Sequence, residues 1–218
     1  FRGEVIRAFQ NAGWIFHGET CINKCPVTAM QRTKSIRLLH AQIKKDSCIS
    51  GPGLADYIVA FRKPGDNPEP VDGLFDIYIG TDGRAVEKAT AEMMARGYSR
   101  EESYSVAVWQ KYAAPVWNDI NQTRTLQYRT ARDEKDEQHI SPLQLDVIER
   151  CIDLWSNPGD VLFTPFLGIG SEVYAAVEMG RRGIGIELKP SYFQQAARNL
   201  AEARRRADAG TLLDRVAS

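Results

Sequence analysis

The chain has 218 residues, of which 43% are hydrophobic, and this is enough apolar material for one large domain or for one domain with an inserted lobe. Its 28 Lys and Arg residues balance its 28 Asp and Glu residues, so net charge does not single out a nucleic-acid partner. No run of about 18 apolar residues occurs, which excludes a transmembrane helix on sequence grounds.

The N-terminal residues and the spacing of the cysteines predict whether the sequence is complete and whether the protein binds a metal. The chain starts at Phe1, without Met and without an apolar leader, so we expect that an upstream part is missing. Cys21 and Cys25 are spaced like half a zinc site, but no second pair completes four ligands. We therefore expect no bound metal, and free thiols in the reducing cytoplasm.

The first half of the chain predicts helices and strands in alternation. Apolar positions with helical spacing predict a helix over residues 3–12, and Gly13 is placed to end it. Trp14–Ile22 predicts a buried strand, and Met30–Lys45 has the apolar spacing of a helix. Asp56–Arg62 is rich in β-branched and aromatic residues and is the clearest strand of this half.

A linker rich in proline divides the chain. Residues 63–70 have the sequence Lys-Pro-Gly-Asp-Asn-Pro-Glu-Pro, so we place a sub-domain boundary there. The region 71–115 then predicts a short strand at Phe75–Ile79 and one or two helices between Ala85 and Tyr112. No pattern in this region indicates chemistry of its own.

The elements alternate regularly in the last third of the chain. Pro142–Trp155 predicts a helix with the proline in its first turn, and Val161–Phe166 is a continuous apolar strand of the kind found in parallel sheets. We expect a helix, a strand and a helix to follow, over Ser171–Met179, Gly183–Glu187 and Pro190–Arg206. This β-α-β-α order predicts a doubly wound, Rossmann-like α/β fold.

The turn between the first of these strands and its helix carries the chemistry. It contains Phe166-Leu-Gly168-Ile-Gly170, where glycines let the backbone approach a ligand without a Cβ in the way. Glu187 lies 17 residues after Gly170, at the end of the next strand, where an acid can bind two ribose hydroxyls. A dinucleotide fingerprint requires a third glycine where this chain has Val173. The pattern therefore favours a nucleoside ligand without phosphates.

The segment Thr164-Pro-Phe-Leu-Gly-Ile-Gly-Ser-Glu172 resembles the cofactor loop of DNA amino-methyltransferases, which act on adenine N6 or cytosine N4. In that family the aromatic-x-Gly-x-Gly turn holds the methionine part of S-adenosyl-L-methionine, and an acid such as Glu187 holds its ribose. His139–Gln144 resembles the segment that lies across the methionine end of the cofactor. The resemblance thus implies S-adenosyl-L-methionine as the cofactor and a set of cofactor-binding residues, namely Thr164, Phe166, Gly168, Gly170, Glu187, His139 and Pro142.

The order of the parts resembles the permuted class of this family, and Val116–Glu149 resembles its phage and prophage members. In that class a catalytic half precedes a target-recognition region and the cofactor half. Residues 1–64 would then be the end of the catalytic half, 65–138 the recognition lobe with its linker, and 139–218 the cofactor half. The resemblance implies a methyltransferase-like sheet with an inserted recognition lobe, a missing N-terminal catalytic part, and double-stranded DNA as the partner.

The catalytic turn of the family, Asp/Asn/Ser-Pro-Pro-aromatic, does not occur in this chain. In the family its polar side chain and a carbonyl accept the hydrogens of the exocyclic amine, and its aromatic ring stacks on the flipped base. The three partial matches have a single proline, and one of them lacks the polar head: Asn67-Pro68-Glu69, Ala114-Pro115-Val116 and Asn157-Pro158-Gly159. We expect the turn upstream of Phe1, in a parent protein that favours adenine N6 over cytosine N4, and we expect this chain alone to be inactive.

Two alternatives stay open beside this reading. The chain can be a non-catalytic cofactor- or DNA-binding module, such as a degenerate or accessory methyltransferase subunit. It can also be a dinucleotide-dependent oxidoreductase, which Val173 disfavours.

For DNA contact, the sequence indicates Arg32, Thr33 and Lys34, which we expect in a loop within the basic stretch 31–45. A solvated basic loop that touches no DNA is the alternative for these residues.

Overall fold

The computed structural model describes residues 1–71, 90–99, 109–127 and 142–217, and for Arg32 and residues 207–217 it describes the backbone without the side chains. The chain divides into two compact units. The first consists of Phe1–Pro70 and Arg84–Ile120, and the second of Val71–Gly83 and Asn121–Ser218. Among the described residues, no helix is long and apolar enough to cross a membrane.

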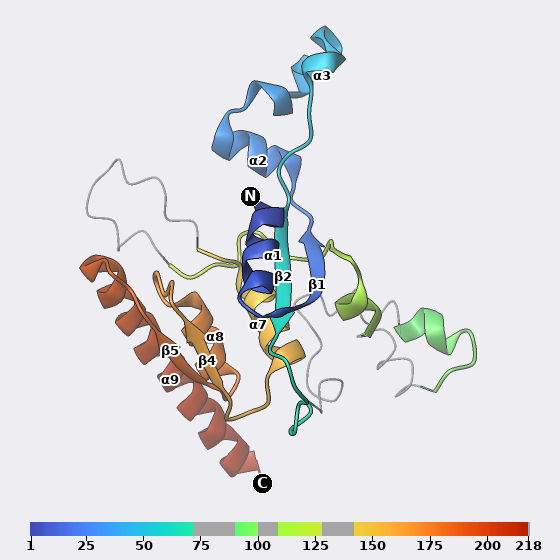
Figure 1. Cartoon of the computed structure of the whole chain (residues 1–218). Coiled ribbons are helices and arrows are strands. Elements are labelled where there is room, and N and C mark those ends of the chain that lie inside the picture. The colour runs from blue at the N-terminus through green and yellow to red at the C-terminus, as the bar shows by residue number, and fades with distance from the viewer. Residues whose placement is uncertain (72–89, 100–108, 128–141, 218) are drawn as a thin grey trace. The chain divides into compact units, whose positions relative to one another are not determined.

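The first unit contains a three-stranded sheet in the order β2-β1-β3 (Figure 1). β1 (Ile15–Ile22) pairs with β2 (Asp56–Arg62) in antiparallel register and with β3 (Val116–Trp117) in parallel register. The expected strand Asp56–Arg62 is confirmed with the same bounds. The expectation of a buried first strand was wrong, because Ile22 is its only buried residue and Phe16 is exposed.

Helix α1 (Arg2–Asn11) packs on this sheet. The ring of Phe9 stacks on that of Phe61 with 4.6 Å between the centroids. The guanidinium of Arg2 lies 3.1 Å from a carboxylate oxygen of Glu19 and 4.0 Å from the centre of the Tyr57 ring. The helix expected over residues 3–12 is therefore present, and an aromatic stack and one cation hold it on the strands.

A helical insertion joins β1 to β2. It contains α2 (Pro26–Thr33), the 3₁₀ turn η1 (Ile36–Leu38), α3 (His40–Lys45) and the 3₁₀ turn η2 (Ser47–Ile49).

The continuous helix expected over Met30–Lys45 was wrong, because the chain breaks after Thr33. Lys34 adopts a left-handed conformation with φ 51° and ends the helix. The hydroxyl of Thr33 donates to the carbonyl of Ala29 at 2.8 Å and accepts from the amide of Ser35 at 3.3 Å. A hydroxyl that bonds to the backbone on both sides in this way competes with helix propagation.

The region after the proline-rich linker is described in part. The expected strand Phe75–Ile79 lies outside the described residues. Of the helical region expected between Ala85 and Tyr112, residues 90–99 and 109–112 are described. Residues 90–94 and 109–112 are helical, and residues 95–97 form a turn.

The second unit has the expected order of helices and strands around a two-stranded parallel sheet (Figure 1). Its elements are α7 (Leu145–Trp155), β4 (Val161–Thr164), α8 (Ser171–Glu178), β5 (Arg182–Gly185) and α9 (Pro190–Ala217). The α/β fold class is thereby confirmed, and within the described residues β4 and β5 are the parallel strands of this unit.

Several bounds differ from the expected ones: α8 ends one residue earlier, β5 covers Arg182–Gly185 rather than Gly183–Glu187, and α9 continues beyond Arg206 to Ala217. Two further differences have a local reason. α7 begins at Leu145 rather than at Pro142, because Gln144 has an extended conformation and caps the helix. β4 ends at Thr164 rather than at Phe166, because the next residue is Pro165, which has no amide hydrogen for the ladder.

The core of the second unit lies between α7 and α8. The face of α7 expected from its spacing is confirmed, since Leu145, Ile148 and Ile152 are buried against Tyr174 and two alanines of α8. Burial of a side chain of this size contributes about 1.5–3 kcal/mol. This packing fixes α8, and with it the turn that precedes α8.

Glycines on β5 allow α8 and its preceding turn to approach the sheet closely. A Cβ on Gly183 would collide with the side chain of Val173, and a Cβ on Gly185 would collide with that of Leu167. Val173 is buried and fills the space that the glycine leaves. The valine that replaces the third glycine of a dinucleotide fingerprint therefore has a packing role here.

Candidate functional site

The candidate site lies at the carboxyl ends of β4 and β5. The amide of Ile186 donates to the carbonyl of Thr164 at 3.0 Å, and the amide of Leu167 donates to the carbonyl of Ile186 at 2.9 Å. The hydroxyl of Thr164 accepts from the amide of Phe166 at 3.2 Å. These bonds fasten the turn after β4 to the chain that leaves β5. Thr164 thus shapes the turn from a buried position.

The two glycines of the turn are needed for different reasons. Both have positive φ, 54° at Gly168 and 88° at Gly170, a conformation that costs other residues about 1–2 kcal/mol. A Cβ on Gly168 would meet nothing within 4 Å, so this part of the backbone faces open space. A Cβ on Gly170 would lie 3.1 Å from the Cβ of Ala196 on α9. Gly168 therefore leaves its backbone accessible, and Gly170 lets the turn pack on α9.

Glu187 is held beside the turn through both of its carboxylate oxygens. Its Oε2 accepts from the amide of Gly168 at 2.8 Å, and its Oε1 accepts from the amide of Lys189 at 2.8 Å. A carboxylate oxygen has a second lone pair, so each can still accept from a hydroxyl of a ligand. The acid predicted from the sequence is thus joined to the predicted glycine turn by a direct hydrogen bond.

Two buried amide side chains of α9 support the same turn, and the sequence pattern did not identify them. The Nδ2 of Asn199 donates to the carbonyl of Ile169 at 2.8 Å, and the Nε2 of Gln195 donates to the Oδ1 of Asn199 at 2.9 Å. Their spacing of four residues places them on one face of a helix, which is a weak sequence indication. Their partner is a backbone carbonyl 30 residues away, which no local pattern reveals.

Exposed apolar side chains flank the turn. Phe166 is 84% exposed and Leu188 is 94% exposed, although they lie only two and three residues after the ends of β4 and β5. Apolar side chains beside a cradle of backbone amides are the usual lining of sites for small ligands. A planar, partly apolar ligand would cover them.

Glu172 adds a second carboxyl group, in the first turn of α8. Burial raises the pKa of Glu172 above its usual range, and a hydrogen bond from the backbone offsets part of the shift. The helix N-terminus favours negative charge at this position.

The described residues contain no other cluster of ligating groups. No group of three or more His, Cys, Asp or Glu side chains within them is placed to hold a metal ion, and all four cysteines are free. Hydrogen bonds from the backbone of Thr28 and Val27 lower the pKa of Cys25, which caps α2. Burial raises the pKa of Cys151 to about 12.

Five of the predicted cofactor residues come together in the second unit, namely Thr164, Phe166, Gly168, Gly170 and Glu187. Pro142 is half-buried and lies three positions before Leu145, the first residue of α7. His139 lies outside the described residues, so its contact with the site stays a prediction.

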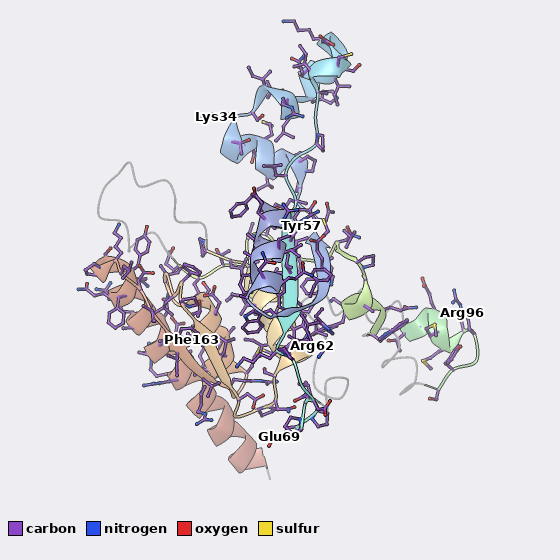
Figure 2. The ribbon with its side chains drawn as sticks, viewed as in Figure 1. Lys34, Tyr57, Arg62, Glu69, Arg96 and Phe163 are labelled. Carbon is purple, nitrogen blue, oxygen red and sulfur yellow. The ribbon has the colours of Figure 1, made fainter. Side chains whose placement is uncertain are left out.

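The predicted DNA-contact residues belong to the first unit. The expectation that they form a loop was wrong for two of them, because Arg32 and Thr33 lie in the last turn of α2. Lys34 caps this helix and is exposed (Figure 2). The amide of Lys34 donates to the carbonyl of Met30 at 2.7 Å, so the helical hydrogen bonds continue to the end of α2.

Similar solved structures share the fold. The chain superposes on the putative DNA modification methylase TTHA0409 of Thermus thermophilus, complexed with S-adenosyl-L-methionine, with a TM-score of 0.52 and 20% identity. The match covers 93% of this chain and 60% of that one. The cofactor expected from the sequence is thus the ligand of a structural relative.

Curated relatives match over shorter stretches. Type II methyltransferase M1.MboII of Moraxella bovis is 40% identical over 58 residues, which is 27% of this chain and 22% of that protein. The DNA adenine methyltransferase YhdJ of Escherichia coli K12 is 32% identical over 91 residues, which is 42% of this chain and 29% of that protein. The matched stretches thus span less than a third of either relative.

The family comparison covers nearly the whole chain. The model for N6/N4 methyltransferases, described as DNA methylase, matches residues 4–198. This range includes most of both compact units, the glycine turn and Glu187. The chain therefore belongs to the DNA methylase family of N6- and N4-amino-methyltransferases.

Proposed function

We propose that this chain binds S-adenosyl-L-methionine and contributes to methyl transfer onto the exocyclic amine of a DNA base. The observation that carries the proposal is the 2.8 Å hydrogen bond between the amide of Gly168 and the carboxylate of Glu187. It joins a glycine turn and an acid at the carboxyl edge of two parallel strands, which is where open α/β sheets bind nucleoside ligands. The cofactor would supply an electrophilic methyl group.

The residues of the turn fit this cofactor. Glu187 has lone pairs left for two ribose hydroxyls, and the backbone at Gly168 faces open space. Phe166 and Leu188 offer apolar surface to the rest of the nucleoside. The cofactor has no phosphates, and this fits the presence of Val173 where a dinucleotide fingerprint has its third glycine. His139 and Pro142 are proposed to contact the methionine end.

We favour adenine N6 over cytosine N4 as the methyl acceptor. The support is the relative YhdJ, which is named as a DNA adenine methyltransferase. The amine of either base is a poor nucleophile, because its lone pair is delocalised into the ring, and acceptors must be aimed at its hydrogens. The chain contains no Pro-Pro-aromatic turn that would do this. We therefore propose that the chain alone binds the cofactor without transferring its methyl group.

The proposed division of labour has three parts. Residues 1–64 would close the catalytic half, 65–138 would recognise the target in DNA, and 139–218 would bind the cofactor. The proline-rich composition of residues 63–70 supports the first division, and the site geometry after Pro142 supports the last.

One assay tests both halves of this proposal. The chain is equilibrated with methyl-labelled S-adenosyl-L-methionine, with and without double-stranded DNA, and label is counted on the protein and in the DNA. We expect bound cofactor and unlabelled DNA. Labelled DNA would show that the catalytic residues lie within this chain, and absence of bound cofactor would contradict the proposal itself.

A non-catalytic, cofactor-binding module is the second candidate function. It is favoured by the same missing turn, since a degenerate or accessory subunit would also lack it. The same labelled-cofactor assay, repeated with a parent protein that carries a Pro-Pro-aromatic turn, separates the two candidates: transfer by that protein supports the enzyme.

We further propose that α2 and its cap touch the phosphates of double-stranded DNA through Arg32, Thr33 and Lys34. The amine of Lys34 is exposed, and the hydroxyl of Thr33 already donates to Ala29. Thr33 therefore fixes the end of the helix, and the two cations supply the attraction.

Charge removal at this site has a matched control. We expect Lys34→Ala and Arg32→Ala each to weaken DNA binding uniformly across sequences and to reduce the salt slope by about one. Lys24→Ala is the control, since Lys24 is already ion-paired with Asp56. The measurement is fluorescence anisotropy on labelled duplexes at several salt concentrations. Equal salt slopes in all the variants and the wild type would contradict phosphate contact at α2.

A further inference from the structure

Two buried side chains of α9 support the glycine turn through hydrogen bonds. Gln195 and Asn199 are 6% and 7% exposed, so each lies almost entirely inside the second unit. Their side-chain amides form a chain of two hydrogen bonds, from Gln195 to Asn199 and from Asn199 to the carbonyl of Ile169. A buried polar pair of this kind is costly unless its bonds are made, so it specifies one geometry.

Their target is one peptide plane between two left-handed glycines. The carbonyl of Ile169 accepts from Asn199 at 2.8 Å, and the amide at the other side of the same peptide, that of Gly170, donates to the carbonyl of Leu167 at 2.8 Å. Because a peptide bond is planar, a bond at each end fixes the orientation of the whole unit. The glycines that flank Ile169 have little conformational preference of their own, so these bonds determine the shape of the turn.

Helix α9 also limits how closely the turn can approach it. Ala196, between the two amides in sequence, is 1% exposed and would be 3.1 Å from a Cβ on Gly170. One residue before Ile169, the amide of Gly168 donates to Glu187. The support from α9 therefore reaches the carboxylate of Glu187 through a turn of three residues.

We propose that Asn199, oriented by Gln195, is a positioning residue that holds the glycine turn in the conformation that binds a nucleoside cofactor. The proposal rests on the proposed function for the identity of the ligand. The positioning role extends the proposed function, because it assigns part of the affinity for the cofactor to Gln195 and Asn199. These two buried side chains act on the turn and not on the cofactor itself.

The first test is Asn199→Leu, a substitution of similar volume that removes the donor to Ile169. We expect the dissociation constant for S-adenosylhomocysteine, measured by calorimetry, to rise at least tenfold. We also expect the amide of Gly170 to exchange hydrogen at least tenfold faster in the ligand-free protein. Gln194→Leu is the matched control, because Gln194 is an exposed amide side chain on the same helix, and it should change neither quantity.

A second variant separates positioning from general packing. In Asn199→Asp the shape and the acceptor for Gln195 are kept, but an ionised carboxylate faces the carbonyl of Ile169. We expect the affinity loss to be greatest at high pH and to recover as the new carboxyl group protonates, since a neutral acid donates to a carbonyl. Wild type measured over the same pH range corrects for titration of other groups, and a packing role alone produces no such recovery.

Gln195 is tested through its dependence on Asn199. We expect Gln195→Leu to weaken binding less than Asn199→Leu, and the double variant to lose less than the two single losses combined. Fully additive losses would overturn the claim that Gln195 acts through Asn199.

The outcomes distinguish this inference from the proposed function. Wild-type affinity in Asn199→Leu, an equal loss in Gln194→Leu, or a pH-independent loss in Asn199→Asp would overturn the positioning role. Wild-type protein that binds no S-adenosylhomocysteine would instead overturn the proposed function, and hydrogen exchange at Gly170 would then still decide whether Asn199 holds the turn.

Discussion

Gly168 and Gly170 share a left-handed conformation but differ in what surrounds them, and this difference predicts two distinct phenotypes. Gly170→Ala places a methyl group against Ala196, so we expect the free energy of unfolding to fall by about 2 kcal/mol. Gly168→Ala meets open space, so we expect about 1 kcal/mol of destabilisation and a larger relative loss of cofactor affinity. Urea unfolding and calorimetry with S-adenosylhomocysteine measure the two effects. Identical profiles for the two variants would contradict the geometry of the turn.

The partly buried carboxyl group of Glu172 makes the free energy of unfolding depend on pH. Burial raises its pKa in the folded state, so the folded protein binds the proton more tightly than the unfolded chain. Its contribution to stability is therefore fully present below the ordinary value of 4.5 and is lost as pH rises through the raised pKa. We expect Glu172→Gln to lose less stability than the wild type between pH 4 and pH 7, as measured by urea unfolding. A larger loss in the variant would show that the sign is wrong.

Single residues differ in how far the sequence identifies them. Gly168, Gly170 and Glu187 are predictable because a turn between strand and helix and an acid after the next strand are local patterns. Asn199 is not, since its role depends on a carbonyl that tertiary packing brings to it.

Among the elements, α7 is fixed to the segment before it by a partly buried ion network. Asp146 is fully buried and accepts from Arg124 Nη1 and from the amide of Asn121, at 2.8 and 2.7 Å. Arg124 also binds both carboxylate oxygens of Glu149. The hydrogen bonds to Glu149, and then those to Asp146, raise the pKa of Arg124, which therefore stays charged.

Removal of this cation should be costly, because it leaves a buried carboxylate without its partner. We expect Arg124→Met to lower the free energy of unfolding by about 2 kcal/mol, less than for a fully buried pair since Arg124 is 37% exposed. Arg206→Met is the control, because its ion pairs with Glu202 and Glu178 are made by a guanidinium that is 62% exposed, and we expect no measurable change. An equal effect of the two substitutions on urea unfolding would contradict the partly buried network.

The ends of a helix or strand are predictable where they depend only on neighbouring residues in the sequence. Asp56–Arg62 was predicted with its observed bounds, because four of its seven residues are β-branched or aromatic and a linker rich in proline and glycine follows it. The break after Thr33 was not predicted, because it depends on a side-chain hydroxyl that bonds to the backbone in place of helix continuation. The start of α7 at Leu145 likewise depends on a long-range bond, from its amide to the carbonyl of Arg124.

At the scale of the whole molecule, a neutral net charge conceals an uneven distribution. The insertion at residues 23–55 contains six Lys and Arg residues and one acid, Asp46, whereas positive and negative residues balance over the complete chain. A locally basic surface on a neutral protein attracts phosphates within about a Debye length without making the whole protein bind polyanions. This distribution is consistent with the DNA contacts proposed at α2.

The fold class and the order of the second unit were predictable because an alternation of apolar strands with amphipathic helices allows few topologies. The sheet of the first unit was less predictable from the sequence, since β3 consists of two residues and pairs with a strand about 95 positions earlier in the chain. Family membership then rests on a match that reaches into both units.

The central claim is that the turn at Gly168–Gly170, together with Glu187, binds a nucleoside cofactor without phosphates. Titration calorimetry of the chain with S-adenosylhomocysteine and with NAD tests it most directly. We predict that one molecule of S-adenosylhomocysteine binds per chain, that Glu187→Ala weakens this binding at least tenfold, and that NAD gives no heat of binding. Binding of NAD in preference to S-adenosylhomocysteine, or binding of S-adenosylhomocysteine that Glu187→Ala leaves unchanged, would contradict the account.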